Sequence, residues 1–192
     1  MLNSISFGKK LVANCQVKRP ISPVSECKIF ELEKTDNDYF DKVKSDHNWD
    51  RNRFLWIMQE QTKPERFDND TQIFVLENNT GECLGYINLI SRANKLIQYL
   101  EITPQIIKLG NKAFSKEIAR TLISAVVNSA QKENKEKISV LAFDFHTKKF
   151  YTKNCGFKSG IQTYDYVLDK KHYSKFLEKY TKNDGVSIDF NV

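Results

Sequence analysis

Two side chains, Tyr151 and Glu101, have the chemistry to transfer protons and lie in contexts that set them apart. Tyr151 is in the stretch FYTKNCGFKSG, Phe150 to Gly160, where a Gly-Phe pair follows an aromatic pair. The glycine there can end a helix with a positive φ, so the stretch predicts a helix, a turn and a strand. The Tyr151 hydroxyl then either packs against a carbonyl or takes part in chemistry. Glu101, in KLIQYLEIT, is either an outward-facing strand residue or a proton acceptor.

The hydrophobic pattern predicts a mixed α/β (α+β) protein in which one long helix connects two groups of strands. Strand-like runs separated by turn signals such as NNTGE predict a three-stranded antiparallel meander. The strands on either side of the long helix form a βαβ unit and should be parallel. The predicted strands are 27–33, 71–77, 83–90, 95–103, 137–143, 157–169 and 186–190. The predicted helices are two between 36 and 60, a long one with a buried stripe from Phe114 to Ser129, a short one over 146–154, and one over 171–180.

Composition and charge bound the class of protein. A chain of 192 residues with 40% hydrophobic residues fits one domain with one core, residues 1–192. The net charge of +6 favours acidic partners such as a phosphorylated cofactor or RNA, although the lysines are spread as a solvated surface. Four scattered cysteines and three distant histidines predict no metal site. No apolar run approaches the ~20 residues that span a membrane, and no secretory signal is found, so we expect a cytoplasmic protein with reduced thiols.

This order of elements, together with three motifs, resembles the GNAT superfamily of N-acetyltransferases. The motifs are GECLGYINLI, LEITP followed by the long helix, and FYTKNCGFKSG. The resemblance covers Cys27 to Asp169, with residues 1–26 as an N-terminal extension and residues 170–192 as a C-terminal helix and strand. It implies a mixed, mostly antiparallel central sheet with a βαβ core and helices on both faces.

The resemblance also implies an enzyme. It would be an acetyl-CoA-dependent N-acetyltransferase that acts on the primary amine of a small molecule, peptide or protein by direct transfer in a ternary complex. In that family two parallel strands part and the pantetheine arm pairs with one strand edge. Here the strands would be Leu96–Thr103 and Lys137–Phe143, parting near Ile102. Tyr151 matches the hydroxyl that reprotonates the coenzyme A thiolate, and Glu101 would serve as the base.

The phosphate-binding loop of that family is present only in a degenerate form. One register is Phe114–Ala119, where Glu117 replaces the central glycine; the other is Lys108–Ala113, which keeps a cation first and an alanine last. In either register the pyrophosphate would lie on N–H groups at the start of the long helix. Asp144 either contacts the cofactor or caps the short helix. The residues expected to bind the cofactor are Leu100, Ile102, Thr103, Lys108, Gly110, Asn111, Lys112, Ala113, Ser115, Lys116, Asp144 and Phe150.

Two other functions stay open at this point. The degenerate loop would also suit a catalytically impaired binding protein on the same scaffold. The basic charge permits an acetyltransferase directed at tRNA, although no base-reading aromatic platform is recognised in the sequence. Trp49, Phe54 and Trp56 either wall an acceptor pocket or pack in the core. We expect a monomer or a homodimer.

Overall fold

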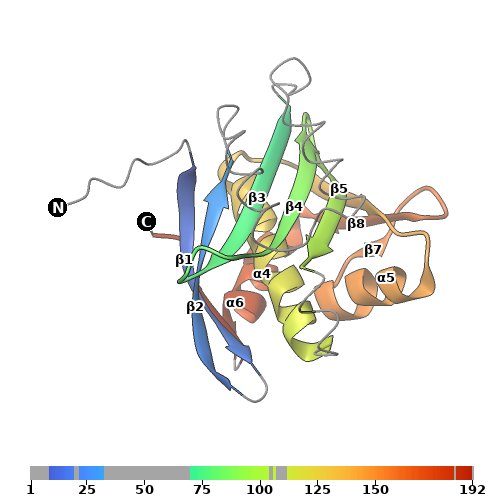
Figure 1. Ribbon diagram of the computed structural model, residues 1–192. Coiled ribbons are helices and arrows are strands. Elements are labelled where there is room, and N and C mark those ends of the chain that lie inside the picture. The colour runs from blue at the N-terminus through green and yellow to red at the C-terminus, as the bar shows by residue number, and fades with distance from the viewer. Residues whose placement is uncertain are drawn as a thin grey trace.

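The computed structural model describes residues 9–19, 22–32, 70–103, 106, 112–183 and 185–191. Within these residues, ten strands form one sheet in the order β7-β8-β6-β5-β4-β3-β2-β1-β10-β9. Figure 1 shows this sheet twisted across the molecule, with helices α4 and α6 behind it. The strands are β1 (Lys10–Arg19), β2 (Ser22–Glu31), β3 (Thr71–Asn78), β4 (Cys83–Ser91), β5 (Lys95–Ile102), β6 (Lys137–Leu141), β7 (Lys158–Ser159), β8 (Asp165–Asp169), β9 (Lys182–Asn183) and β10 (Val186–Asp189).

The predicted meander and βαβ unit are confirmed. Strands β3, β4 and β5 pair antiparallel in sequence order. Helix α4 (Lys112–Lys132) then crosses over to β6, which pairs parallel to β5. All other pairs are antiparallel, so the predicted mixed, mostly antiparallel sheet is correct. The two helices predicted between residues 36 and 60, and the aromatic residues Trp49, Phe54 and Trp56 within them, lie outside the described residues.

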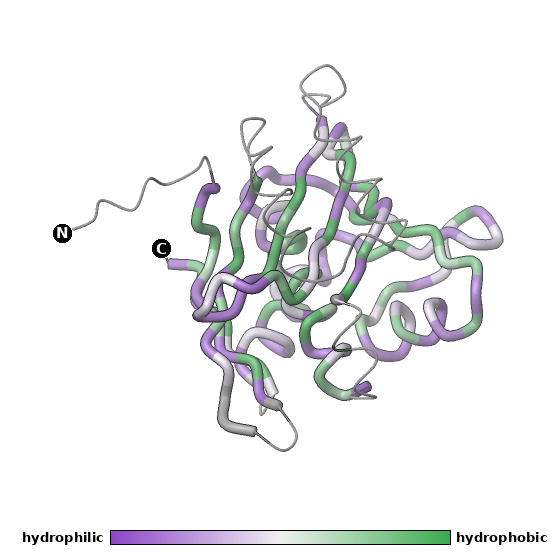
Figure 2. The backbone as a smooth tube through the Cα atoms, viewed as in Figure 1, coloured by the Kyte–Doolittle hydropathy of each residue, from purple (hydrophilic) through white to green (hydrophobic). Residues whose placement is uncertain are grey.

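Helix α4 buries the predicted stripe against the sheet. Its residues Phe114, Ile118, Leu122, Ala125 and Val126 are all buried, and Ser129 is half-buried. Burying a large aliphatic or aromatic side chain contributes about 1.5–3 kcal/mol, so this stripe fixes α4 on one face of the sheet. Helix α6 (Tyr173–Thr181) packs beside it and adds further buried aromatic residues. Figure 2 shows hydrophobic residues along the central strands.

Three elements differ from the sequence prediction. The region before residue 27 holds strand β1, which pairs with β2 on one side and β10 on the other. The predicted strand 157–169 is wrong, because it is two strands, β7 and β8, joined by a turn. The predicted short helix is α5 (Phe145–Lys149) followed by a π-helical turn, η2 (Phe150–Asn154).

The glycine expected to end the short helix does so. Gly156 has φ +74°, a left-handed conformation that a residue with a Cβ adopts at a cost. The turn lets the chain reverse from η2 into β7, and the Phe157 N–H donates to the Tyr151 carbonyl at 3.0 Å. The positive φ at Gly156 therefore fixes the position of the element that carries Tyr151.

Candidate functional site

Strands β5 and β6 part after only three residue pairs. Lys95 pairs with Ile138, Leu96 with Ser139, and Ile97 with Val140. β5 continues to Ile102, paired only with β4, and none of the other described strands pairs with it on the β6 side beyond Ile97. The predicted parting point near Ile102 is wrong by five residues. We call residues Gln98–Ile102 the open edge of β5.

A β-bulge lies where the strands part. Asn88 pairs with Tyr99 and the next β4 residue, Leu89, pairs with Ile97, so Gln98 is an extra residue on β5. A bulge bends the strand that holds it and increases its local twist. Gln98 thus marks the point at which β5 turns away from β6, and the bulge explains why the pairing stops there.

The pleat divides the open edge between two faces. Leu100 and Ile102 lie opposite Ile87 and Gly85 and pack against the core on the α4 side. Tyr99 and Glu101 are on the other face, with Asn88 and Tyr86 as their cross-strand neighbours. The sequence analysis selected Glu101 but missed Tyr86 and Asn88, which are almost completely buried. The alternation in CLGYINLI places these two on one face, which is the signal that would have found them.

Glu101 is a partly desolvated carboxylate. Burial raises its pKa above the ordinary value for a glutamate. The pKa of the neighbouring Tyr86 phenol is also raised, mainly by burial and to a smaller extent by the charge of Glu101. A carboxyl whose pKa moves toward neutrality is better matched to accept a proton from an amine than a fully solvated one. This environment suits a general base.

Gly85 allows β4 to approach β5 closely beside Glu101. A Cβ at Gly85 would lie 2.7 Å from the backbone oxygen of Glu101 and 3.1 Å from Cγ2 of Ile118 on α4. Since backbone oxygen cannot give way cheaply, any larger residue there would displace β5. The glycine in GECLGYINLI therefore has a packing role at the candidate site.

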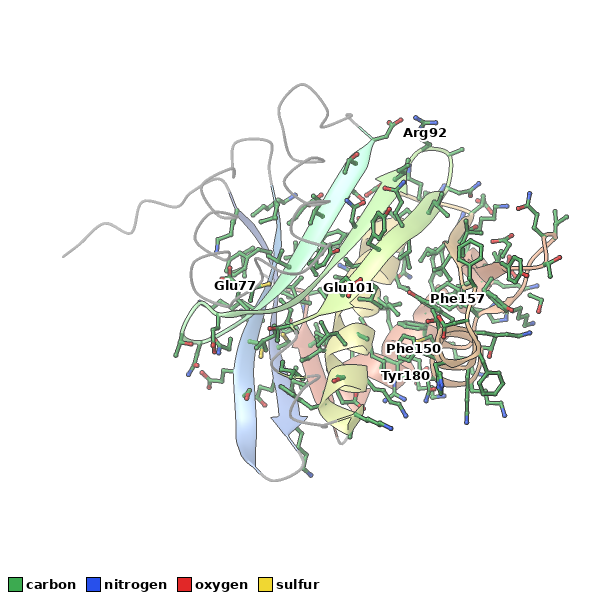
Figure 3. The ribbon with its side chains drawn as sticks, turned by 45° about the vertical axis from the view of Figure 1, so that its right-hand side comes forward. Glu77, Arg92, Glu101, Phe150, Phe157 and Tyr180 are labelled. Carbon is green, nitrogen blue, oxygen red and sulfur yellow. The ribbon has the colours of Figure 1, made fainter. Side chains whose placement is uncertain are left out.

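Tyr151 lies in the π-helical turn that follows β6 and α5. Figure 3 shows Glu101 on β5 and, apart from it, Phe150 and Phe157 on the chain after β6. The Tyr151 ring is held edge-on between these rings, with centroid distances of 5.4 Å to Phe150 and 5.3 Å to Phe157. π-helical turns occur often at functional sites, because they aim one side chain out of the regular helical register.

The Tyr151 hydroxyl differs from the rest of its side chain. Only 3% of the residue is exposed, and burial raises its pKa above the ordinary phenol value, with a smaller contribution from the nearby Cys155. The hydroxyl makes no hydrogen bond with a described residue, and it is not among the buried polar atoms without a partner. No described residue therefore accepts the proton of this hydroxyl. The phenol stays protonated at neutral pH and its proton is not committed to a carbonyl.

Asp144 has a capping role in the structure. Its carboxylate accepts hydrogen bonds from the Thr147 N–H, at 2.9 Å, and from the Thr147 hydroxyl. These bonds lower the pKa of Asp144. This is the capping alternative of the sequence analysis, and contact with a cofactor stays a prediction. Phe150, also predicted to contact the cofactor, is half-buried beside Tyr151.

The expected cofactor-binding residues fall in three places. Leu100, Ile102 and Thr103 are at the open edge or directly after it. Thr103 is 4% exposed, and its hydroxyl has no hydrogen-bond partner among the described residues. Lys112, Ala113, Ser115 and Lys116 are in the first turns of α4, and Asp144 and Phe150 are on the chain after β6. Lys108, Gly110 and Asn111 lie outside the described residues.

The two loop registers differ in what the structure places there. Phe114–Ala119 lies within α4, so it is helix and not a loop. Glu117 there is bound to Arg120 of the same helix at 2.5 Å. The register 108–113 instead precedes or begins α4, where a helix start favours an anion. A glutamate therefore stands in place of the central glycine only in the register 114–119, which is helical.

Apolar side chains are exposed beside the parted strands. Leu141 of β6 is 45% exposed, Phe143 after it is 71% exposed, and Tyr99 on the open edge is 38% exposed. Phe143 packs against Tyr164 of the β7–β8 turn with a centroid distance of 5.2 Å and the two rings tilted by 45°. The described helices include none long and apolar enough to cross a membrane, and the described residues contain no group of three or more metal-ligating side chains.

Of the comparisons with known proteins, the one with solved structures identifies the fold. No protein-family model matches the sequence. No curated protein matches it significantly. Among solved structures, spermidine N-acetyltransferase from Vibrio cholerae in complex with CoA and spermine is 18% identical, with a TM-score of 0.53 over 77% of this chain and 98% of that one. A dodecameric structure of the same Vibrio cholerae enzyme is 19% identical, with a TM-score of 0.51 over 77% of this chain and 95% of that one. A KacTA–DNA complex is 14% identical, with a TM-score of 0.51 over 65% and 84%. The chain therefore has the fold of the GNAT N-acetyltransferases, as the sequence predicts.

Proposed function

We propose that this protein is an acetyl-CoA-dependent N-acetyltransferase that transfers the acetyl group directly to a primary amine of a small molecule, peptide or protein. The observation that carries the proposal is the parting of β5 and β6 at the Gln98 bulge. This parting leaves a strand edge that no other described strand pairs with, and the edge carries a partly desolvated carboxylate, Glu101. A buried phenol, Tyr151, lies in the turn that follows β6 and α5.

The open edge of β5 fits the amide groups of a pantetheine arm. An extended chain with peptide-like groups can add to an unpaired strand edge by main-chain hydrogen bonds. Leu100, Ile102 and Thr103 would supply these groups, and the buried Thr103 hydroxyl has hydrogen-bonding capacity that no described residue uses. Lys112 and Lys116, in the first turns of α4, would complement phosphates near the helix start. Acetyl-CoA supplies an activated acyl group as a thioester.

Each protein group then has one task. The raised pKa of Glu101 lets its carboxylate accept the proton that the attacking amine loses as the new C–N bond forms. Tyr151 holds its proton at neutral pH and gives it to the sulfur that leaves as the C–S bond breaks. Backbone N–H groups of the open edge would stabilise the developing negative charge on the acyl oxygen. The two proton transfers are thus assigned to residues on different elements, Glu101 on β5 and Tyr151 in the turn after α5.

The structural neighbours support the class of reaction. The Vibrio cholerae protein of the same fold was crystallised with CoA and spermine, which are a thiol cofactor and an amine. The identity of 18% carries no conclusion about the acceptor here. Monomer or homodimer remains our prediction for the oligomeric state.

The test measures coenzyme A release from acetyl-CoA with a panel of monoamines, polyamines and peptides. We expect release that depends on an acceptor, and a thermal shift with acetyl-CoA alone. Ligand at ~100 times its dissociation constant should stabilise the fold by ~2.7 kcal/mol. The absence of any shift at millimolar acetyl-CoA would contradict the proposal. A shift without turnover for any amine would instead support the catalytically impaired binding protein.

A further inference from the structure

We propose that Tyr180, on the C-terminal helix α6, is a positioning residue for Tyr151. The proposal rests on the proposed function in one respect, namely that Tyr151 acts as the acid. Tyr180 is 6% exposed, and its hydroxyl donates a hydrogen bond to the backbone carbonyl of Asn154, 26 positions away in the sequence. Asn154 is the last residue of the π-helical turn that carries Tyr151.

The π-helical turn needs support at this end. At its end the Cys155 N–H donates to the Phe150 carbonyl, and no side chain of a described residue caps its start. Carbonyls at the end of a helix lack partners within the helix, and a buried carbonyl without a partner costs about 1–3 kcal/mol. The Tyr180 hydroxyl supplies the missing donor for Asn154. Together with the Phe157 bond to the Tyr151 carbonyl, it anchors the turn at the carbonyls of Tyr151 and Asn154.

The Tyr180 ring is itself held in place by its neighbours. Phe176 of the same helix lies 4.6 Å away between ring centroids. Two cations face the ring, with Lys179 at 5.0 Å and the Arg120 guanidinium of α4 at 5.5 Å from the centroid. Arg120 is oriented by Glu117 at 2.5 Å. A continuous set of contacts therefore runs from α4 through α6 to the turn that carries Tyr151. Figure 3 labels Tyr180 on α6 and Phe150 in that turn.

The location of Tyr180 explains why the sequence did not select it. It lies beyond Asp169, outside the part of the chain that resembles the acetyltransferase family. Helix α6 packs on α4 as well as on β10, so its buried aromatic residues could be interpreted as core packing alone. The hydrogen bond to Asn154 is what distinguishes Tyr180 from the other aromatic residues of α6.

The experiment compares Tyr180→Phe with a matched control, Tyr173→Phe. Tyr173 is on the same helix and 1% exposed, and its hydroxyl is buried without a partner among the described residues. Both changes remove one buried hydroxyl and keep the ring. Amide hydrogen exchange over residues 150–157 reports the turn without turnover, and kcat and KM for acetyl-CoA report its effect on the reaction.

We expect Tyr180→Phe to speed exchange in this segment and to lower kcat by about 10- to 100-fold with little change in KM, because a small misplacement of a reacting group has effects of this size. Tyr173→Phe should change neither. In a Tyr151→Phe background, Tyr180→Phe should change kcat by no more than about twofold, because the two residues act as one unit.

Three results would overturn the proposal in distinguishable ways. Unchanged exchange in Tyr180→Phe would mean that the hydroxyl does not hold the turn. A loss of kcat that persists undiminished in the Tyr151→Phe background would mean that Tyr180 acts elsewhere. If Tyr151→Phe itself keeps full activity while exchange still responds to Tyr180→Phe, the acid role in the proposed function fails and the positioning role fails with it.

Discussion

The Nζ of Lys95, the first residue of β5, lies 2.7 Å from Oε1 of Glu133, just after the end of α4. The Lys95 side chain is completely buried, and its Nζ also bonds to Gln72, Ser91 and Ser129. These bonds tie the start of β5 to the end of the crossover helix that leads to β6. The interaction lies at the end of β5 where its three pairs with β6 are found. The Lys95–Glu133 ion pair therefore stabilises the end of β5 that is opposite the open edge.

Replacing Lys95 with methionine should destabilise the protein. The change removes four hydrogen bonds. Glu133 is one-third exposed and keeps its ion pair with Lys135 at 3.5 Å, so its charge does not become both buried and unpaired. We expect a loss of about 1–3 kcal/mol in the free energy of unfolding, measured by urea denaturation. The matched control is Lys170→Met, which breaks an exposed pair with Glu136 and should cost at most about 1 kcal/mol. Equal losses for the two variants would contradict this role for Lys95.

The same pair predicts a dependence of stability on acid pH. Partial burial raises the pKa of Glu133, but hydrogen bonds from Lys95 and Ser129 and the Lys95 charge outweigh it and lower this pKa to about 2, from an ordinary 4.5. A folded-state pKa below the unfolded one stabilises the fold above pH 4.5, and this contribution is lost as the pH falls from 4.5 towards 2. Stability curves of the natural protein and of Glu133→Gln, measured from pH 6 down to about pH 2, should therefore converge. A constant difference across this range would be inconsistent with the pKa shift.

Deleting Gln98 tests whether the bulge makes the cofactor site. The deletion joins Ile97 to Tyr99 while their partners Leu89 and Asn88 stay adjacent, so every β4–β5 pair and every facing direction is kept. We expect the fold to remain and β5 to continue alongside β6, which would close the open edge. The thermal shift with acetyl-CoA, about 2.7 kcal/mol at 100 times the dissociation constant, should then vanish. A deletion variant that binds acetyl-CoA as tightly as the natural protein would separate binding from the bulge.

Part of this architecture follows from local sequence patterns. The meander is predictable because β3, β4 and β5 are short, largely apolar runs separated by turn signals. The parallel pairing of β5 and β6 follows from the long crossover helix. Gly156 is predictable because a glycine at the end of a helix commonly adopts a positive φ. These features each depend on a few neighbouring residues.

Other features depend on tertiary contacts that no local pattern encodes. The bulge at Gln98 exists only in the pairing of β5 with β4, so the parting point of the strands could not be placed from the sequence. Lysine is rarely buried, and the burial of Lys95 depends on partners from β3, β4 and α4 and on Glu133 just beyond it. Strand β1 was missed because its buried positions, Ala13, Cys15 and Val17, are small and give a weak hydrophobic signal.

The base role of Glu101 predicts a specific change in the pH profile. A base works only when ionised, so kcat/KM should rise as the pH passes upward through the raised pKa of Glu101. Glu101→Gln should lower the rate by about 10²- to 10⁴-fold and remove this limb of the profile, leaving only the titration of the amine. The profiles are compared with one acceptor at constant ionic strength. If kcat/KM of Glu101→Gln still rises with pH in the same range, the rise belongs to another group.

Gly156 and Gly81 offer a matched pair for separating stability from activity. Both have a positive φ, at +74° for Gly156 and +80° for Gly81. A Cβ at Gly156 meets nothing within 4 Å, so Gly156→Ala adds backbone strain without a clash. Each alanine substitution should cost about 1–2 kcal/mol in the free energy of unfolding, from the strain of a left-handed conformation.

Only one of these two variants should affect the reaction. Gly156 lies between Cys155, which caps the Tyr151-bearing turn, and Phe157, whose N–H donates to the Tyr151 carbonyl. Strain relieved by a shift in φ at Gly156 would therefore move Tyr151, whereas Gly81 is in the turn between β3 and β4 and touches neither Tyr151 nor Phe157. We expect Gly156→Ala to lower kcat and Gly81→Ala to leave it unchanged, measured at a temperature where both variants are fully folded. Equal effects on kcat would show that the activity follows global stability and not the placement of the phenol.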